Sequence, residues 1–357
     1  YVDLKDQPVP EGQHLLEVDD LKMYFHTEDG VVRAVDGVSY TLDRGDTLGV
    51  VGESGSGKSV TAITIMGLIS MPPGKIEGGD VRYRGRSILE MTEEEMQHIR
   101  GNDIAMIFQD PMTSLNPVYK IGKQVGEGLR LHRGYSKQEA LKRATELLDL
   151  VGIPEPEKRV NEYPHQFSGG MRQRVMIAMA LACDPDILIA DEPTTALDVT
   201  IQAQIIELMQ EMQEKNGNAI IMITHDLGVV ADMADKIMVM YAGRPVEFGT
   251  AEEIFYESRH PYTWGLIRSI PEQAIEEKKP LTPIHGNPPS LMNLPEGCVF
   301  SPRCPYATDK CRKQRPERVV TESGHYSACH YSGDPEFLKN APETSRTRKD
   351  SKKGGEA

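Results

Sequence analysis

One octapeptide has the residue types and the spacing of a phosphate-binding loop. Residues 52–59 read Gly-Glu-Ser-Gly-Ser-Gly-Lys-Ser, which fits the pattern G-x-x-x-x-G-K-[ST]. Glycines at this spacing let successive backbone N–H groups turn inward around phosphate oxygens. The lysine can reach the outer phosphates, and the hydroxyl of the last serine can bind Mg²⁺. The nucleotide-binding residues that this loop predicts are Gly52, Ser54, Gly55, Ser56, Gly57, Lys58, Ser59 and Val60.

The elements that must position this loop lie on either side of it in the sequence. The apolar run 48–51 is typical of a buried strand, and residues 60–66 can continue as a helix. A helix that begins at the loop adds its partial positive charge to the phosphate site. Because the pattern stands in this strand–loop–helix context, the sequence predicts that the chain binds a nucleoside triphosphate.

A second polar motif could support hydrolysis of the triphosphate. The apolar run 187–190 predicts another buried strand, and it ends in Asp191 and Glu192. We expect Asp191 to hold Mg²⁺, directly or through water, opposite Ser59. Glu192 is the candidate general base, or the group that orients the attacking water.

A short glycine motif precedes these carboxylates in the chain. Residues 167–174 read Phe-Ser-Gly-Gly-Met-Arg-Gln-Arg, and a long alanine- and methionine-rich stretch follows them. With this motif ahead of the Asp-Glu pair, residues 15–250 resemble the nucleotide-binding subunits of ATP-binding-cassette (ABC) transporters. The peptide importers of the oligopeptide or dipeptide permease type look most similar. Residues 109–117, Gln-Asp-Pro-Met-Thr-Ser-Leu-Asn-Pro, and residues 260–263, His-Pro-Tyr-Thr, point to that branch.

The resemblance implies the fold class, and composition and patterning along the chain give the domain organisation. The fold would be α/β, a P-loop NTPase ABC cassette with a mixed sheet core plus a helical subdomain, followed by a small Cys/Pro-rich C-terminal extension. The expected divisions are an N-terminal lead-in over 1–14, a nucleotide-binding domain over 15–250 with its helical subdomain at about 85–180, the C-terminal extension over 251–331, and a disordered tail over 332–357.

The resemblance also assigns roles to two polar residues that follow apolar runs. His225 would contact the γ-phosphate and fix the catalytic carboxylate, and Gln109 would sense Mg²⁺ and the attacking water. The implied catalytic residues are Glu192, His225, Lys58 and Gln109, and the implied Mg²⁺ ligands are Ser59, Gln109 and Asp191.

The glycine motif implies that two cassettes act together. In the family, Ser168, Gly169 and Gly170 lie at a helix N-terminus and bind the γ-phosphate of the ATP held by the other subunit. A helix N-terminus with small residues is a sound anion site. Asp198 matches the loop that crosses to that subunit. Met171 stands where many cassettes carry glutamine, which leaves the turnover rate open. A single chain would therefore hold half of each composite ATP site, and the family suggests a non-identical partner cassette.

An aromatic residue in the first strand is expected to stack on the adenine. Phe25 aligns best by its spacing from the phosphate loop, and Tyr24 is the alternative. Neighbouring residues of a strand point to opposite faces, so only one of the two can stack on the base.

Four of the five cysteines lie in a segment rich in proline and glycine, namely Cys298, Cys304, Cys311 and Cys329. Such a segment has little material for a hydrophobic core of its own and needs a staple. In a cytosolic setting, clustered thiolates indicate a metal more often than disulfides. Zinc, an iron–sulfur cluster and free thiols are the alternatives, and the lack of C-x₂-C spacings favours the cluster. The resemblance implies a four-iron four-sulfur (4Fe-4S) cluster.

Charge and hydropathy limit the classes of partner. The formal net charge of −14 and the pI near 5.3 argue against nucleic-acid binding. No stretch approaches about 18 consecutive apolar residues, and no signal-peptide pattern is present. The transporter interpretation therefore requires two transmembrane permease subunits, with residues 113–119 expected to contact them, and indirectly an extracytoplasmic peptide-binding protein. It places the chain at the cytoplasmic face of the membrane as a peripheral subunit.

Alternative functions remain open from the sequence. A soluble, non-transport ABC ATPase would usually carry two cassettes or long coiled-coil insertions, whereas this chain has one phosphate loop and no heptad runs. An ATP-binding regulator without turnover is disfavoured by the presence of Glu192 and His225. An ATPase subunit never touches the cargo, so nickel, a sugar or another solute is an alternative to peptide.

Overall fold

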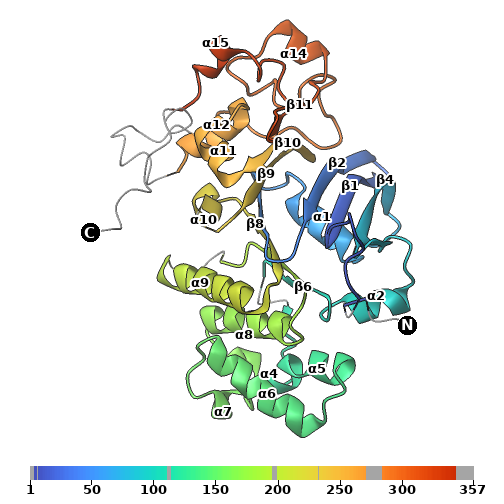
Figure 1. Ribbon diagram of the computed structural model, residues 1–357, viewed down its shortest axis with the longest axis vertical. Coiled ribbons are helices and arrows are strands. Elements are labelled where there is room, and N and C mark those ends of the chain that lie inside the picture. The colour runs from blue at the N-terminus through green and yellow to red at the C-terminus, as the bar shows by residue number, and fades with distance from the viewer. Residues whose placement is uncertain are drawn as a thin grey trace.

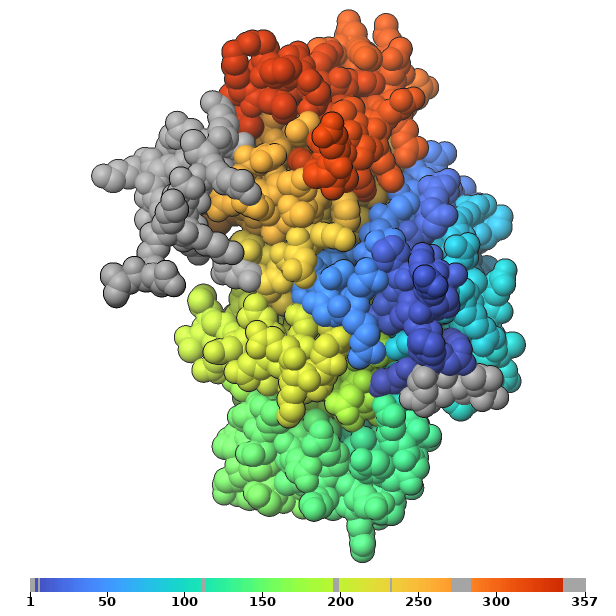
Figure 2. Space-filling model, in the orientation of Figure 1, coloured from blue at the N-terminus to red at the C-terminus, as the bar shows by residue number. Residues whose placement is uncertain are grey.

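The computed structural model describes residues 4–5, 7–110, 114–194, 199–231, 233–270 and 284–342. Within these ranges the chain forms one eight-stranded and one four-stranded sheet, with helices packed around them. One end of the molecule consists of the helices from α4 (Ile121–Val125) to α7 (Pro156–Arg159), and the opposite end contains α14 (Asp309–Lys313) and α15 (Pro335–Leu338) (Figure 1). The space-filling view shows both ends packed on the middle of the molecule, where Figure 1 places the strands (Figure 2).

The larger sheet is mixed, as the family resemblance implies. Its strand order is β11-β12-β10-β9-β3-β8-β7-β6. The strands β6, β7, β8, β3 and β9 run parallel, whereas β10 pairs antiparallel with β9 and β12, and β12 pairs antiparallel with β11. The bounds are β3 Thr47–Val51, β6 Ile104–Ile107, β7 Ile187–Asp191, β8 Ala219–Thr224, β9 Lys236–Tyr241, β10 Arg244–Thr250, β11 Val319–Val320 and β12 Tyr326–Ser327. Every residue of β3, β7 and β8 is buried, which explains their continuous apolar runs.

The smaller sheet is antiparallel and covers the helix that follows the phosphate loop. Its order is β2-β1-β4-β5, with β1 Leu16–Thr27, β2 Gly30–Leu42, β4 Gly74–Tyr83 and β5 Arg86–Ser87. The helix α1, Lys58–Ile65, packs between the two sheets, because Val50 of β3, Ile65 of α1 and Val81 of β4 belong to one buried cluster. The short helix α2, Glu93–Ile99, follows β5 and begins at a capping box of Thr92 and Glu95.

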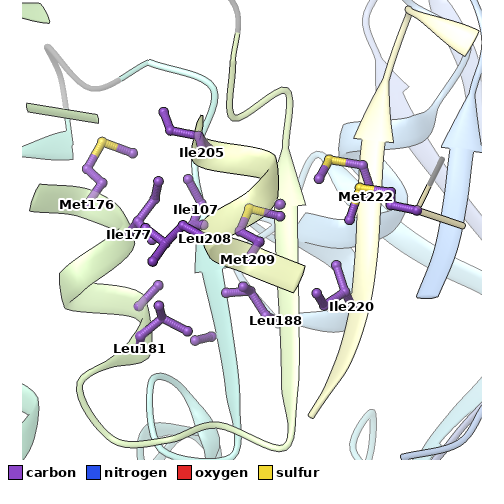
Figure 3. Close-up of a cluster of buried hydrophobic side chains, with 14 of the residues drawn as sticks. Ile107, Met176, Ile177, Leu181, Leu188, Ile205, Leu208, Met209, Ile220 and Met222 are labelled. Atoms are coloured by element: carbon purple, nitrogen blue, oxygen red, sulfur yellow. The ribbon is translucent and has the colours of Figure 1, made fainter. Parts of the chain in front are cut away.

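Two long helices cover the parallel part of the larger sheet. They are α8, Gly169–Leu181, and α9, Val199–Asn216. Figure 3 shows their apolar side chains, including Ile177 and Met209, against Leu188 of β7 and Ile220 of β8. This packing places the start of α8 and the ends of the parallel strands in fixed positions relative to each other.

The helical end of the molecule is a small bundle that packs on α8. It contains α4 Ile121–Val125, α5 Glu127–His132, α6 Lys137–Leu150, α7 Pro156–Arg159 and the 3₁₀ turn η1 Pro164–Gln166. The helix α6 begins at a capping box, in which Ser136 Oγ accepts from Glu139 N at 3.3 Å and Glu139 Oε2 accepts from Ser136 N at 2.8 Å. Ala144 and Leu148 of α6 are buried in the same cluster as Ile177 of α8.

The C-terminal extension is joined to the larger sheet. The last helix of the cassette is α10, Leu227–Ala231. The extension contains β11 and β12 and the helices α11 Ala251–Tyr256, α12 Pro261–Arg268, α14 Asp309–Lys313 and α15 Pro335–Leu338. Phe248 of β10 is paired with Tyr326 of β12, and their rings stack with centroids 5.6 Å apart. None of the helices in the described ranges combines the length and apolar composition that a bilayer span requires.

Two details differ from the expected divisions. The segment expected to be helical, 85–180, also contains β5 and β6, and β6 lies in the larger sheet. The tail expected to be disordered from residue 332 includes α15, whose Phe337 packs on Trp264 with ring centroids 5.3 Å apart. The apolar contact of Phe337 orders a segment that is otherwise polar. Residues 343–357 lie outside the described ranges.

Candidate functional site

The phosphate loop turns from β3 into α1, and two of its glycines have no room for a side chain. Gly52 has φ +154°, and a Cβ there would lie 2.2 Å from the carbonyl oxygen of Met240. Gly57 has φ +100°, and its Cβ would lie 2.3 Å from the carbonyl oxygen of Ala34. These close approaches hold the loop against β9 and β2, so that its shape is set by neighbouring backbone as well as by its own sequence.

Lys58 lies inside the loop. Its side-chain nitrogen donates to the carbonyl oxygens of Gly52 at 2.7 Å and Glu53 at 3.0 Å. Burial lowers the pKa of Lys58, and the nearby charges of Glu192, Asp191 and Glu53 act in the opposite direction. Ser56 Oγ is buried close by and has no hydrogen-bond partner among the described residues. The loop thus presents a cation and an unused hydroxyl, which suit a phosphate oxygen.

Two oxygen ligands suited to Mg²⁺ meet at the start of α1. Ser59 Oγ donates to Asp191 Oδ1 at 3.0 Å. Burial raises the pKa of Asp191, the charge of Glu192 raises it further, and the Ser59 hydrogen bond lowers it. Mg²⁺ prefers one or two carboxylates together with substrate phosphates, and the oxygens of this pair have the chemistry of such ligands.

The ends of three parallel strands bring polar side chains together around Glu192. Gln109, after β6, donates through Nε2 to Glu192 Oε2 at 3.0 Å. His225, after β8, places Nδ1 3.3 Å from Glu192 Oε1. Glu192 itself has φ +46°, and its backbone N–H donates to Ile223 O at 2.8 Å. A left-handed conformation is unfavourable for glutamate, so the surrounding structure holds this carboxylate in place.

The two candidate aromatic residues of β1 have different surroundings. The Tyr24 hydroxyl donates to Asp36 Oδ1 at 2.9 Å, and the guanidinium of Arg33 lies 6.0 Å from the ring centroid. Phe25 is half-buried and packs, like Val60, against the cluster between the two sheets. The Tyr24 side chain is therefore engaged by β2.

The glycine motif lies at the N-terminus of α8, on the surface. Ser168 is the N-cap, and its Oγ accepts from the backbone N–H of Met171 at 3.3 Å. Ser168 and Gly169 are exposed, and a Cβ on Gly169 would meet no atom within 4 Å. This helix end is open to a group from outside the chain. Asp198, the other residue expected to face a partner cassette, lies outside the described residues.

Sequence reasoning missed two residues that contact the phosphate loop. Arg303 of the C-terminal extension forms a bidentate ion pair with Glu53, and the Tyr262 hydroxyl accepts from the backbone N–H of Glu53 at 2.9 Å. Tyr262 belongs to the His-Pro-Tyr-Thr segment, which the sequence marks without a role. No local pattern signals Arg303, because its partner lies 250 residues away.

The four clustered cysteines line one cavity of the C-terminal extension, here named the cysteine cavity: Cys298, Cys304, Cys311 and Cys329. Burial raises the pKa of the Cys304 thiol to about 11 and that of the Cys329 thiol to about 12. Hydrogen bonds from the backbone of Tyr306 and Tyr331 to these sulfurs act in the opposite direction. Within the described ranges, no group of three or more histidine, cysteine or acidic side chains has the arrangement of a metal-ion site.

Comparison with known proteins agrees with the arrangement of these parts. A family model described as "ABC transporter" matches residues 35–195, and one described as "Oligopeptide/dipeptide transporter, C-terminal region" matches residues 246–311. The oligopeptide transport ATP-binding protein OppD of Bacillus subtilis is 58% identical over 312 residues, which are 87% of this chain and 87% of the relative. The dipeptide transport ATP-binding protein DppD of Escherichia coli is 52% identical over 320 residues, 90% of this chain and 97% of the relative.

Solved structures show the same fold. A dimeric ATP-binding cassette in a post-hydrolysis state bound to ADP and Pi has a TM-score of 0.60 and 28% identity, covering 66% of this chain and 98% of that cassette. This match and the curated relatives agree on the cassette, and the second family model extends the agreement into the C-terminal extension. The chain belongs to the ABC transporter family, among its oligopeptide and dipeptide transport ATP-binding proteins.

Proposed function

We propose that this chain binds and hydrolyses ATP and thereby energises the import of oligopeptides or dipeptides through membrane subunits. The observation that carries the proposal is the meeting of the phosphate loop with the ends of β6, β7 and β8. Ser59 contacts Asp191 there, and Gln109 and His225 both contact Glu192. The named relatives are oligopeptide and dipeptide transport proteins, which supports peptide as the cargo.

Each side chain of this centre has a distinct part in hydrolysis. The backbone N–H groups of residues 52–60 and the Lys58 ammonium would hold the β- and γ-phosphates. Ser59, Asp191 and Gln109 would hold Mg²⁺, whose charge would neutralise that of the phosphates. Glu192 would orient the attacking water and accept its proton, and His225 would hold the Glu192 carboxylate and contact the γ-phosphate.

A second, non-identical cassette would complete the site. The exposed N-terminus of α8, with Ser168, Gly169 and Gly170, would bind the γ-phosphate of an ATP held by that partner. Asp198 would contact the partner across the same interface. Phe25 would stack on the adenine, since the hydroxyl of Tyr24 is bonded to Asp36. ATP bound between the two cassettes would then draw them together.

The membrane subunits would dock on the surface that follows Gln109. Val118 and Tyr119 are exposed there, with 70% and 44% of their surface accessible, and the Lys123 ammonium lies over the Tyr119 ring. Exposed apolar side chains on the segment that follows Gln109 suit a helix presented by a permease subunit. This contact would keep the chain at the cytoplasmic face of the membrane. At the opposite face, the two permease subunits would receive peptide from an extracytoplasmic binding protein. Residues 111–113 of this surface lie outside the described ranges.

We further propose that the cysteine cavity holds a four-iron four-sulfur cluster. Four thiols line it, and backbone hydrogen bonds reach the sulfurs of Cys298, Cys304 and Cys329. Within the described ranges these thiols do not have the arrangement of a metal-ion site, so binding of the cluster would draw them together. Thiolates bound to such a cluster typically accept hydrogen bonds of this kind. The cluster would staple a segment that is rich in proline and poor in core. Zinc is the competing occupant, and the iron, sulfide and zinc content of the purified protein distinguishes the two.

The ATPase proposal is tested by purifying the complex from a detergent extract and replacing Glu192 by glutamine. We expect a second cassette and two hydrophobic subunits to co-purify. Glu192→Gln should lower the hydrolysis rate by about 10²–10⁴-fold, the range of general base catalysis, and leave ATP bound. Glu214→Gln, on the exposed surface of α9, is the matched control and should hydrolyse ATP like the wild type. Wild-type turnover by Glu192→Gln, or purification without membrane subunits, would contradict the proposal.

A further inference from the structure

Two residues of the C-terminal extension contact Glu53 of the phosphate loop, and the first of them is Arg303. Arg303 Nη1 lies 2.6 Å from Glu53 Oε2, and Nη2 lies 3.0 Å from Glu53 Oε1. Only 4% of the Arg303 side chain is exposed, against 29% for Glu53. A paired, bidentate guanidinium–carboxylate contact with one buried partner is among the stronger and more directional ion pairs in proteins.

Contacts with the extension and with β9 hold the guanidinium of Arg303 in place independently of Glu53. Its Nε donates to His285 O at 2.9 Å, and Nη2 also donates to Ile284 O at 3.2 Å. It lies against the Tyr241 ring, 5.8 Å from the centroid, and Nη1 is 3.4 Å from the Tyr241 hydroxyl. The arginine is therefore preorganised, so its contact with the loop costs little side-chain entropy.

A second contact fixes the same loop residue. The backbone N–H of Glu53 donates to the Tyr262 hydroxyl at 2.9 Å, and Tyr262 is fully buried on α12. The rings of Tyr262 and Tyr241 lie 4.6 Å apart, which connects this contact to the arginine. The backbone and the side chain of Glu53 are thus both bound by residues outside the phosphate loop.

The charge of Glu53 matters because the loop receives a polyanion. Glu53 follows the first glycine of the loop, its carbonyl oxygen accepts from the Lys58 ammonium, and its charge acts on the pKa of Lys58. A carboxylate in this position would repel a triphosphate unless a cation neutralises it. Arg303 is the side chain that neutralises it.

We infer that Arg303 is a positioning residue for the phosphate loop: by pairing with Glu53 it keeps an acidic loop receptive to ATP, so that the C-terminal extension sets the ATP affinity of the cassette. The inference rests on the proposed ATP binding at residues 52–60. The inference thereby assigns the extension a part in nucleotide binding. The turn that carries Arg303 also carries Cys298 and Cys304.

The test is a double-mutant cycle on the full-length protein, with the dissociation constant for ATP–Mg²⁺ measured by displacement of a fluorescent nucleotide. Arg303→Gln should weaken ATP binding about tenfold, because it leaves the carboxylate unpaired. Glu53→Gln should bind ATP at least as tightly as the wild type. The double variant should return to within about threefold of the wild type, since it removes the repulsion together with the cation. Arg312→Gln, an exposed arginine of the same extension, is the matched control.

The ATP affinity of the double variant distinguishes an electrostatic role of Arg303 from a purely structural one. If Arg303 only braces Ile284 and His285, the double variant stays as weak as Arg303→Gln, and that result would overturn the inference. Equal affinity in Arg303→Gln and the wild type would overturn it too. If Arg303→Gln does not fold, Arg303→Lys and the double variant carry the comparison, with Lys expected to restore part of the affinity. A wild-type protein without ATP binding would instead refute the proposed function.

Discussion

Replacing Gly57 by alanine tests whether the phosphate loop must lie where the neighbouring backbone holds it. The new Cβ would lie 2.3 Å from the carbonyl oxygen of Ala34, whereas an ordinary contact begins at 3.4 Å. The loop or strand β2 must therefore move by about 1 Å to accept it. Alanine at φ +100° adds about 1–2 kcal/mol of conformational strain.

A displacement of this size should be costly for hydrolysis, because the loop amides must meet the phosphates in a defined geometry. A misplacement of about 1 Å can reduce catalysis about 100-fold, which corresponds to about 2.7 kcal/mol. We expect Gly57→Ala to lower kcat/KM for ATP by about this factor. The assay is phosphate release by the purified complex, with thermal unfolding measured in parallel to separate the effect from loss of the fold.

Gly55→Ala is the matched control for this prediction. Gly55 lies in the same loop at φ +77°, but a Cβ there would meet no atom within 4 Å. It carries the conformational strain without the overlap, so kcat/KM should fall less than about tenfold. Equal losses in both variants would refute the reasoning, because strain alone would then account for the effect. A Gly57→Ala enzyme within about threefold of the wild type would refute it as well.

Three further predictions concern the base, the acid limit of stability and the cysteine cavity. Phe25→Ala should weaken ATP binding about tenfold through the loss of stacking, while Tyr24→Ala should leave the affinity near wild type; the reverse order would assign the base to Tyr24. Burial lowers the pKa of His260 to about 4, whereas the same histidine in the unfolded chain takes up its proton near pH 6.5. The free energy of unfolding should therefore fall by about 3 kcal/mol as the pH is lowered from 6.5 to 4. His260→Asn, which keeps an acceptor for the helix N-terminus, should flatten that slope in urea titrations, and an unchanged slope would exclude His260 as its source. Anaerobically purified protein should contain about four irons and four sulfides per chain and absorb near 400 nm, and Cys304→Ser should lose this band while Cys183→Ala keeps it. One zinc and no colour would replace the cluster by a structural ion, and neither metal would leave free thiols.

Local sequence patterns were sufficient for the parts whose chemistry depends on neighbours in the chain. The phosphate loop between 48–51 and 60–66 is one such part, because a strand, a glycine turn and a helix N-terminus form from consecutive residues. The carboxylates Asp191 and Glu192 at the end of an apolar run are another. The fully buried parallel strands could be recognised since both faces of each strand are covered, which makes the run continuously apolar.

Only the tertiary structure decided how these parts combine with distant residues. Gln109 and His225 reach Glu192 because β6, β7 and β8 are adjacent in the sheet, an order that no local pattern encodes. Tyr24 is bonded to Asp36 by the register of β1 and β2. The pairing of Arg303 with Glu53 joins segments 250 residues apart, at the place where Tyr262 and Phe300 of the extension pack on Tyr241 of β9. Contacts of that kind follow from the packing of whole elements, which the sequence specifies only through the complete fold.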